Sequence, residues 1–581
     1  DAAKIRETLD KRYANYLDRI RQIDSEDVFQ TFMNAYALSI DPHTNYLGPR
    51  ASENFDIAMK LSLEGIGAVL QGRDDYTTIR EIVPGGPAAL SGKFKVGDRI
   101  VGVGQGASGA ITDVVGWRVD DVVDLIRGPK DTTVRLEVLP ADAGPDGKHE
   151  LIALVRKKVN IEEQAAKSSI IDIKDGDSTR KVGVISLPTF YEDFDARRRG
   201  DKNYKSATRD VAKLLDGLKA QHVDAVLMDL RNNGGGSLSE AIDLTGLFVG
   251  KGPVVQVRNA DGRVEVGRNT HENMAWDGPF AVLVNRNSAS ASEIFAGAIQ
   301  DYGRGLIVGE QTYGKGTVQN LVDLDQMSQS EKPSLGELKM TIQQFFRVDG
   351  ASTQLKGVTP DIVFPVTGDF AQNGESTNKN ALAWASIAAA DYTPTSDLKS
   401  ILPMLKSMHD ARVAKEKPWL AYEADVTDFR KLRAETTISL NEKVRREERD
   451  AREKTNKERH PDLAANTVSG DRAIAKNVHE LTSKNVAHNS FAEGSMRQAT
   501  GASDNEDAPA KPSTPTAAPN QDDGLQADER SIQSDLADEK ARKAEKDVVL
   551  HEVANILADE VNLLRTDTKL AARVLPHSAI D

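Results

Sequence analysis

Residues 281–319 read AVLVNRNSASASEIFAGAIQDYGRGLIVGEQTYGKGTVQ, and this stretch decides the fold. Residues 281–284 form a short apolar run typical of a buried strand, and residues 306–308 form a second one. Between them, residues 290–302 carry apolar side chains at helical spacing, and Gly303 is placed to end the helix. A strand, a helix and a strand in close succession predict a βαβ unit with two parallel strands.

This unit predicts that Lys315 returns to the start of the helix at Ser290. A helix rises about 1.5 Å per residue and a strand about 3.3 Å per residue, so the helix and the second strand cover similar distances in opposite directions. The loop of residues 311–316 is therefore expected beside the helix N-terminus. A hydroxyl and an amine then meet at the C-terminal edge of parallel strands, where α/β folds place their chemistry.

A glycine-rich loop is predicted at the same edge of the sheet. Residues 224–230 (DAVLMDL) read as a buried strand, which runs into RNNGGG at 231–236 and then into a helix. Three glycines leave backbone N–H groups free to face a ligand. A tight turn alone would need only two, so we favour a role in binding an anion or oxyanion.

Ser290 and Glu293 have a structural explanation as well as a catalytic one. The sequence Ser-Ala-Ser-Glu at 290–293 is a capping box, which satisfies a helix N-terminus without any chemistry. The return of Lys315 shifts the interpretation towards catalysis, and a helix N-terminus also stabilises negative charge. Spacing alone leaves open which of Ser288, Ser290 and Ser292 is the nucleophile.

Lys315 fits two kinds of site. Residues 309–315 match most of a P-loop, but Gly316 stands where a Ser or Thr must hold magnesium, and a strand pattern follows instead of a helix. The alternative is a general base: a lysine pKa of about 10.4 in water falls towards about 7–8 when the amine is desolvated. A nucleotide-binding protein and a non-catalytic scaffold are the two rival interpretations.

Residues 55–158 contain short strands and glycine turns, with strands expected at 77–83 and 133–138 and a helix at 119–126. The pattern resembles a PDZ domain, in which a peptide extends the sheet edge and backbone N–H groups bind its C-terminal carboxylate. The alternative is a plain domain whose glycines only make turns. The predicted tail-binding residues are Leu63, Gly65, Ile66 and Gly67.

The two ends of the chain are predicted to be helical. Two amphipathic helices open it, with apolar stripes expected to pack (Ile5, Leu9, Tyr13, Tyr16, Leu17 and Ile20; Val28, Phe29, Phe32, Met33 and Tyr36). Further helices are expected at 382–390, 398–409, 426–457 and 549–564. Between them, residues 494–530 are rich in Pro, Ala, Ser, Thr and Asp, a composition typical of disorder. His43, after a proline turn, is expected to be a structural hydrogen-bonding residue.

Composition excludes several functions. A chain of 581 residues predicts several domains, and a net charge of −14 argues against binding nucleic acid. The chain has no cysteine, which excludes disulfides and thiolate metal sites. It also has no HExxH motif, so a zincin is not expected. No apolar run is long enough to span a membrane, so any membrane association is expected to be peripheral. Asp1 and the absence of a signal peptide suggest a processed or trimmed start.

Residues 285–319, DLRNNGGGS at 229–237 and SLEGIGAVL at 62–70 together resemble the C-terminal processing peptidases. The match runs from DPHTNYL at 41–47 to about residue 365. It implies a multidomain α/β fold: a crotonase-like (ββα) protease core with an inserted PDZ domain and flanking helical regions. The implied boundaries are 1–54 (N-terminal helical region), 55–158 (PDZ domain), 159–365 (serine protease core) and 366–581 (C-terminal helical region).

Carried over by position, the resemblance makes Ser290 the nucleophile, Lys315 its base, and Gln319 the residue that orients the amine. Asp301 is the third member by resemblance, but it lies three helical turns from Ser290, so we expect a structural role. The implied oxyanion hole uses backbone N–H groups of Ala291, Gly235 and Gly236, and the implied supporting residues are Glu293 and Thr312.

The resemblance further implies a periplasmic serine endopeptidase whose signal peptide has been removed. It would recognise substrate proteins by apolar C-terminal tails through the PDZ domain and cleave them through an acyl-enzyme. The expected partners are such substrates and a candidate lipoprotein adaptor. No metal or other cofactor is expected.

Overall fold

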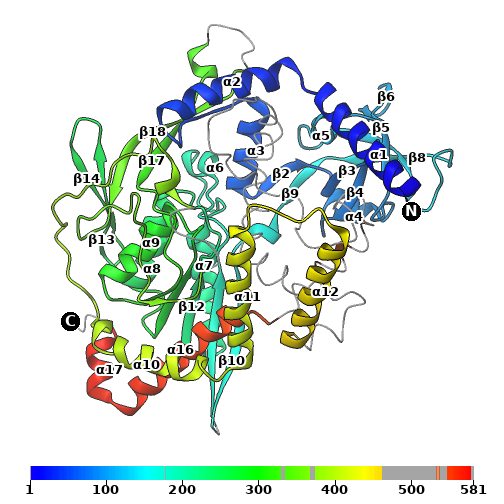
Figure 1. Ribbon diagram of the computed structural model, residues 1–581. Helices are drawn as coiled ribbons and strands as arrows, with labels where there is room; N and C mark the ends of the chain where they lie inside the picture. Colours follow the sequence, from blue (N-terminus) through cyan, green and yellow to red (C-terminus); the bar gives the residue numbers. More distant parts are fainter. Residues whose placement is uncertain are drawn as a thin grey trace. The chain divides into compact units, whose positions relative to one another are not determined.

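The computed structural model describes residues 2–176, 178–328, 334–366, 373–460 and 546–576, together with Ile532, Asp535, Leu536 and Glu539 (Figure 1). The chain divides into two compact units. One comprises residues 1–29, 61–163 and 524–544, and the other residues 30–60, 164–523 and 545–581. No helix in the described part of the chain is long and apolar enough to cross a membrane.

The first unit contains an antiparallel sheet in the order β3-β4-β5-β7-β8, with β6 on β5. Alternate residues of β7 are buried and pack with Val122 and Ile126 of α5. The strands expected at 77–83 and 133–138 and the helix expected at 119–126 are all present. The bounds are β3 (Ala68–Arg73), β4 (Tyr76–Ile82), α4 (Pro87–Ser91), β5 (Arg99–Gln105), β6 (Ile111–Asp113), α5 (Val119–Ile126), β7 (Thr133–Leu139) and β8 (Glu150–Val155).

A short second sheet in this unit pairs β2 (Ser62–Gly65) with β9 (Lys157–Asn160). Of the four predicted tail-binding residues, Leu63 and Gly65 therefore belong to a strand, and Ile66 and Gly67 lie in the turn before β3. The turn is tight, because Gly67 has a φ of 73° and a Cβ placed there would lie 3.0 Å from Gly86 Cα.

The two N-terminal helices, α1 (Ala2–Arg21) and α2 (Ser25–Ile40), form as predicted, but their apolar stripes do not pack as expected. Ile5, Tyr13 and Phe32 are 59%, 69% and 67% exposed. Polar contacts hold the beginning of the chain to its unit instead, including an ion pair of Lys11 with Asp74 (2.6 Å). An amphipathic pattern predicts a helix here but not the surface that its apolar face covers.

The second unit is built on a six-stranded sheet in the order β10-β11-β12-β15-β16-β19. The edge strand β10 (Lys167–Asp175) is antiparallel, and the remaining strands are parallel. Strands β15 (Phe280–Val284) and β16 (Leu306–Gly309) pair in parallel on either side of α9 (Ala291–Asp301), which confirms the predicted βαβ unit. The other strands are β11 (Ser178–Ser186), β12 (Ala225–Asp229) and β19 (Ile362–Val363).

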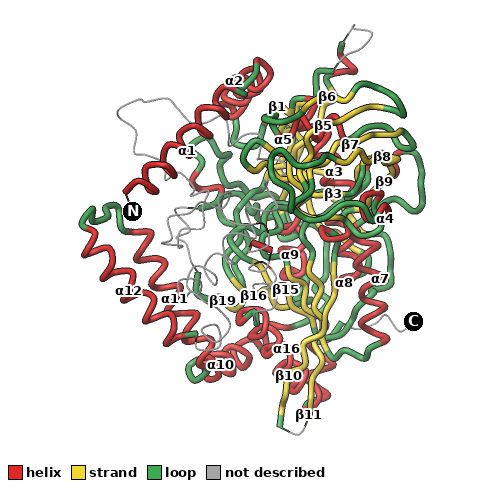
Figure 2. Tube along the Cα trace, turned by 90° about the vertical axis from the view of Figure 1, so that its right-hand side faces the viewer, coloured by secondary structure: helices red, strands yellow, loops and turns green. Residues whose placement is uncertain are grey.

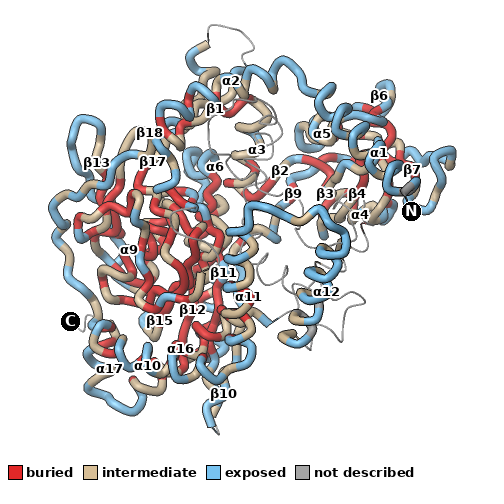
Figure 3. The backbone as a smooth tube through the Cα atoms, in the orientation of Figure 1, coloured by how far each residue is buried: buried red, intermediate tan, exposed pale blue. Residues whose placement is uncertain are grey.

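Helices cover both faces of this sheet, which explains why its central strands β12, β15 and β16 are nearly continuous apolar runs (Figures 2 and 3). On one face, Phe280 stacks on Phe248 of α8 (Leu238–Val249) with ring centroids 4.2 Å apart. On the other face, Leu227 and Leu283 join the core of α10 (Leu402–Val413), α11 (Lys417–Ala434) and α16 (Val548–Thr566). Helix α7 (Ala207–Ala220) adds to the helices around the sheet.

A further antiparallel sheet of this unit gathers distant parts of the chain around β18 (Glu337–Phe346). Strand β17 (Thr317–Asp323), which directly follows Lys315, pairs with β18. Strand β1 (Asn45–Leu47), from the N-terminal region, also pairs with β18. The sheet is completed by β13 (Gly252–Asn259) and β14 (Val264–Asn269).

Two predicted helices are wrong. Residues 382–390 are extended, and the N–H groups of Ile387 and Ala390 donate to the carbonyls of Gly350 and Val348 (2.9 and 2.8 Å), so backbone pairing overrides the helix propensity of the alanines. The helix expected at 426–457 is broken into α11 and α12 (Glu442–Arg459).

The break between α11 and α12 contains the β-branched residues Thr436, Thr437 and Ile438, and Asn441 Oδ1 accepts the Lys443 N–H at 3.0 Å where α12 begins. The helices expected at 398–409 and 549–564 are present as α10, preceded by a 3₁₀ turn at Leu398–Ser400, and as α16. The segment 494–530, predicted to be disordered, lies outside the described residues.

Candidate active site

Ser290 sits at the turn between β15 and α9 in a strained conformation, with φ 57° and ψ −112°. A positive φ is uncommon for a residue with a side chain and persists only where its surroundings hold it. Its N–H donates to Glu293 Oε2 at 2.8 Å, which is the glutamate half of the predicted capping box. The turn therefore presents Ser290 at the helix N-terminus.

Hydrogen bonding separates the three candidate serines. Ser288 Oγ donates to the Leu230 carbonyl (2.8 Å), and Ser292 Oγ donates to the Asn233 carbonyl (2.8 Å); both side chains are fully buried. These two hydroxyls tie the turn to the start of the glycine-rich loop. Ser290 is only partly buried, so it is the serine of the three that a substrate can reach.

The glycine-rich loop lies directly against Ser290. A Cβ placed on Gly235, whose φ is 111°, would lie 2.9 Å from Ser290 Cβ and 3.1 Å from Ala291 N. The Gly235 N–H is already donated to Asn233 Oδ1 (2.9 Å). In the described part of the chain, the N–H groups of Ala291 and Gly236 donate to no protein acceptor. Two of the three predicted oxyanion-hole N–H groups therefore remain available.

The Lys315 amine is buried in the same region. The pKa of Lys315 is lowered to about 7, chiefly by burial and then by the nearby positive charge of Lys339, while Glu375, Glu293 and Asp41 act in the opposite direction. An amine with a pKa near neutrality is able to accept a proton at physiological pH. Its Nζ donates to Gln319 Oε1.

Glu293 joins the loop of Lys315 to the turn of Ser290. Besides the Ser290 N–H, its carboxylate accepts hydrogen bonds from Thr312 Oγ1 (2.6 Å), the Gly314 N–H (2.7 Å) and the Lys315 N–H (3.0 Å). Burial raises the pKa of Glu293 to about 7. The two residues predicted to support the site, Glu293 and Thr312, are thus in direct contact with each other and bridge its two halves.

The same contacts show that the P-loop interpretation is wrong. The N–H groups of Gly314 and Lys315, which a phosphate would need, are donated to the Glu293 carboxylate. A strand, β17, follows Gly316 where a P-loop requires a helix.

Asp301 lies at the far end of α9 and is paired with Arg347. Arg347 Nε donates to Asp301 Oδ2 at 3.1 Å, and the guanidinium also donates to Gln300 Oε1 at 3.0 Å. Among the described residues, no hydrogen bond or ion pair joins Asp301 to Ser290 or Lys315. The geometry fits a residue that ties the helix C-terminus to the segment after β18.

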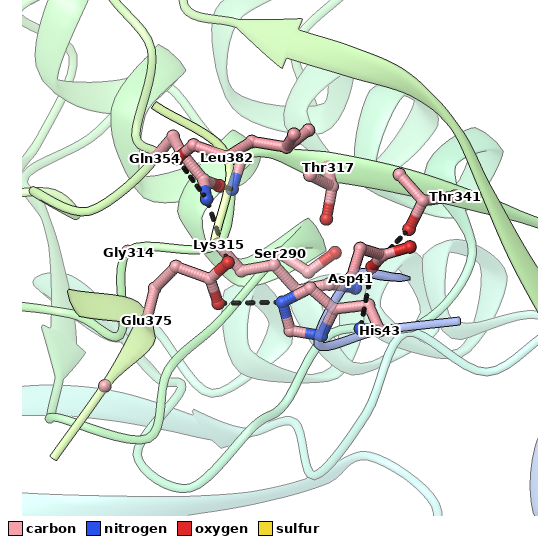
Figure 4. Close-up of polar contacts among 12 residues, drawn as sticks. Asp41, His43, Ser290, Gly314, Lys315, Thr317, Thr341, Gln354, Glu375 and Leu382 are labelled. Carbon is pink, nitrogen blue, oxygen red and sulfur yellow. Dashed lines mark hydrogen bonds and ion pairs between the residues drawn. The ribbon is translucent and has the colours of Figure 1, made fainter. Parts of the chain in front are cut away.

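Several residues around Lys315 escaped sequence analysis: Asp41, Thr341, Gln354 and Glu375 (Figure 4). Glu375 Oε2 pairs with His43 Nε2 at 2.7 Å, and Glu375 Oε1 accepts from Gln354 Nε2 at 2.8 Å. Gln354 Oε1 in turn accepts the N–H of Gly316 (2.7 Å). The proline turn before His43 is the signal in the sequence for this segment, and the contact of His43 with Glu375 agrees with the structural role predicted there.

The predicted tail site in the first unit keeps two backbone donors. Within the described ranges, the N–H groups of Ile66 and Gly67 donate to no protein acceptor, while their carbonyls accept from Ala88 (2.8 Å) and Val83 (3.0 Å). The Ile66 side chain is buried in the core of the unit. A turn that is fixed by its carbonyls and has free N–H groups suits a carboxylate ligand.

Four family models match the chain in succession. They are the tail specific protease N-terminal domain (1–50), the PDZ domain (56–139), peptidase family S41 (181–364) and the C-terminal domain of tail specific protease (DUF3340, 369–562). The chain belongs to the C-terminal processing peptidases of family S41, of the tail-specific protease (Prc) type. The predicted fold class, a multidomain α/β chain with a crotonase-like protease core, a PDZ domain and flanking helical regions, is confirmed.

A tail-specific protease from Haemophilus influenzae is 44% identical over 451 residues, covering 77% of this chain and 62% of the relative. A carboxy-terminal processing protease from Bacillus subtilis is 31% identical over 323 residues, covering 55% of this chain and 60% of the relative. The chain therefore spans 60–62% of the length of these curated relatives. A solved PDZ domain of a carboxy-terminal protease from Vibrio cholerae, in complex with peptide, is 59% identical over 17% of this chain and 99% of its own, with a TM-score of 0.16.

Proposed function

We propose that this protein is a serine endopeptidase in which Ser290 is the nucleophile and Lys315 is the general base. The observation that carries the proposal is the buried Lys315 amine with a pKa of about 7, in a loop that shares the Glu293 carboxylate with the Ser290 N–H. A buried amine without a catalytic task would be an unexplained cost to the fold, because burial disfavours its charged form.

In the proposed mechanism, Ser290 Oγ attacks the carbonyl carbon of the scissile bond as its proton moves to Lys315 Nζ. The negative charge that develops on the carbonyl oxygen is stabilised by the N–H group of Ala291, the first residue of α9, and by the N–H group of Gly236 in the glycine-rich loop. The C–N bond then breaks, and Lys315 returns the proton to the leaving amine. The products of this step are an acyl-enzyme and a new N-terminus.

The second half of the reaction reverses the first with water in place of the amine. Lys315 Nζ accepts a proton from water as the water oxygen attacks the acyl carbon. The tetrahedral intermediate uses the same two N–H groups, and collapse returns the proton to Ser290 Oγ. Gln319 Oε1, which accepts from Lys315 Nζ, keeps the amine in place through both halves.

We propose further that substrates are proteins with apolar C-terminal tails, held by the PDZ domain while an internal bond is cleaved. The family model over residues 56–139 and the free N–H groups of Ile66 and Gly67 support tail recognition. The periplasm as compartment and a lipoprotein adaptor as partner rest on the resemblance to the C-terminal processing peptidases.

The test is cleavage of an unfolded substrate by the wild type and by Ser290→Ala and Lys315→Ala. Both variants are expected to fold and to lose activity by about 10³-fold or more. Near-normal activity of Lys315→Ala would contradict the dyad. Covalent labelling of Ser290 by a fluorophosphonate would exclude a non-catalytic scaffold, and equal cleavage of substrates with apolar and charged C-termini would remove the tail-recognition proposal.

A further inference from the structure

The Gln319 side-chain amide makes hydrogen bonds through both its oxygen and its nitrogen, and its orientation decides whether Lys315 can act as a base. Its Oε1 accepts from Lys315 Nζ, while its Nε2 donates to Thr317 Oγ1 (2.9 Å) and to Thr341 Oγ1 (3.0 Å). An amide turned by 180° would place its NH₂ group against the lysine instead. Some feature of the site must therefore select one of the two orientations.

The selecting feature is Asp41. Its carboxylate accepts from the His43 N–H (2.8 Å), from Thr341 Oγ1 (3.0 Å) and from Thr44 Oγ1. An ionised carboxylate has no hydrogen to donate, so Thr341 must give its hydroxyl hydrogen to Asp41. The Thr341 oxygen is then left as an acceptor, and only the NH₂ end of Gln319 can face it.

The direction of this chain of hydrogen bonds matters for catalysis. A neutral lysine amine has two hydrogens and one lone pair. When it donates to Gln319 Oε1, its lone pair stays free to accept the Ser290 proton. If the amide were reversed, its N–H would point at that lone pair and the amine would lose its function as a base.

Asp41 is held firmly enough to impose this direction (Figure 4). It is buried, and the residues that follow it enter β1, which pairs with β18 on the strand that carries Thr341. The Thr341 N–H donates to Thr44 Oγ1 at 3.2 Å, and His43 is fixed by Glu375 at 2.7 Å. Both backbone and side-chain contacts thus lock residues 41–44 onto β18.

We propose that Asp41 and Thr341 are positioning residues for catalysis: they set the polarity of the Gln319 amide and thereby keep the lone pair of Lys315 available to Ser290. The inference rests on the proposed function and adds to it a contribution from the N-terminal region, about 270 residues before the lysine in the sequence. Neither residue touches the reacting atoms.

The test compares Asp41→Asn, Thr341→Val and Thr341→Ser with the wild type, using kcat and KM for an unfolded substrate as functions of pH. Asp41→Asn changes one oxygen to NH₂ and lets the chain of hydrogen bonds reverse, and Thr341→Val removes its middle member. Both are expected to lower kcat about 10- to 100-fold with little change in KM. Thr341→Ser keeps the hydroxyl and is expected to retain activity within about threefold.

The pH profile separates positioning from loss of structure. The charged groups that act on Lys315 are Lys339, Glu375, Glu293 and Asp41. Because Asp41→Asn removes a negative charge and a reversed amide favours the neutral amine, the acidic limb of kcat should move to lower pH even as the plateau falls. The double variant Asp41→Asn/Thr341→Val should be no worse than the poorer single variant, since both break one chain.

The matched control is Asp323→Asn, the same chemical change at the far end of β17, where the carboxylate accepts hydrogen bonds from Asp325 and Gln326 of a local turn. Asp323→Asn is expected to leave both the plateau and the acidic limb of kcat unchanged. The inference would be overturned if Asp41→Asn kept the wild-type plateau and the wild-type acidic limb of kcat. Equal losses of kcat in Thr341→Val and Thr341→Ser would overturn it as well. If Asp41→Asn does not fold, the two Thr341 variants decide the matter. An active Lys315→Ala would instead overturn the proposed function itself.

Discussion

The two halves of the candidate site are held in different ways. On the nucleophile side, Ser290 is fixed by its own βαβ unit, by a strained backbone and by the glycine-rich loop that packs against it. On the base side, Lys315 is fixed by side chains from distant segments, through Gln319, Thr341 and Asp41. Backbone geometry positions the alcohol, and a chain of polar side chains positions the amine.

Because they are held differently, the two halves of the site should respond differently to mutation. A backbone-held group is sensitive to added volume, because close-packed main-chain atoms cannot move aside. A side-chain relay is sensitive instead to a change in the pattern of donors and acceptors at constant volume.

Among the changes that leave both Ser290 and Lys315 in place, the largest effect is expected from Gly235→Ala on the nucleophile side. The new Cβ would lie 2.9 Å from Ser290 Cβ at a φ of 111°, so both the turn and the oxyanion hole must shift. We expect kcat/KM to fall about 100-fold or more, together with a loss of stability of about 1–3 kcal/mol. Steady-state kinetics and thermal unfolding check these values.

The neighbouring Gly234→Ala is the matched control, because a Cβ there would meet no atom of the described residues within 4 Å. It should keep activity within about threefold. Equal losses in the two variants would show that the close contact with Ser290 is not what matters at Gly235.

A smaller effect is expected from Glu293→Gln, which changes the residue shared by both halves. Four donors converge on this carboxylate, whereas an amide offers one oxygen and presents its NH₂ to donors that need an acceptor. We expect kcat to fall about 10- to 100-fold and stability to fall by about 2–4 kcal/mol. Kinetics combined with denaturant unfolding would show both losses, and a loss of only one of them would contradict a joint role.

Lys315→Met should abolish cleavage yet stabilise the protein. The pKa of Lys315 is about 7 in the folded chain against 10.5 in the unfolded one, so the folded state is penalised fully below pH 7 and progressively less as the pH rises towards 10.5. The gain should be on the order of a few kcal/mol at pH 6 and should shrink by pH 10. Thermal unfolding at the two pH values measures it, and a gain that grows with pH would contradict a buried amine.

The smallest effect is expected from Asp301→Asn, because Asp301 lies outside both halves of the candidate site. The change weakens the pair with Arg347 and should cost about 1–2 kcal/mol of stability while kcat/KM stays within about threefold. Arg347→Gln should behave in the same way. An inactive Asp301→Asn with unchanged stability would instead indicate a direct role in the reaction.

The contrast also explains what the sequence could predict. The βαβ unit and the return of Lys315 to Ser290 follow from short-range periodicity and residue lengths, so they were predictable. Asp41, Thr341 and Glu375 could not be found this way, because their contacts join segments about 300 residues or more apart in sequence. Tertiary pairing likewise made residues 382–390 extended against their helix propensity.

The most direct test of the Ser290–Lys315 dyad is the rate at which a fluorophosphonate phosphonylates Ser290 as a function of pH. The wild-type rate is expected to rise with a midpoint near pH 7, where the buried amine loses its proton. Glu293→Gln should keep the rise at a lower plateau and move its midpoint to lower pH, because the Glu293 charge raises the pKa of Lys315. Lys315→Met should react about 10³-fold more slowly and without that midpoint. A Lys315→Met enzyme that kept the wild-type rate and midpoint would contradict the central claim.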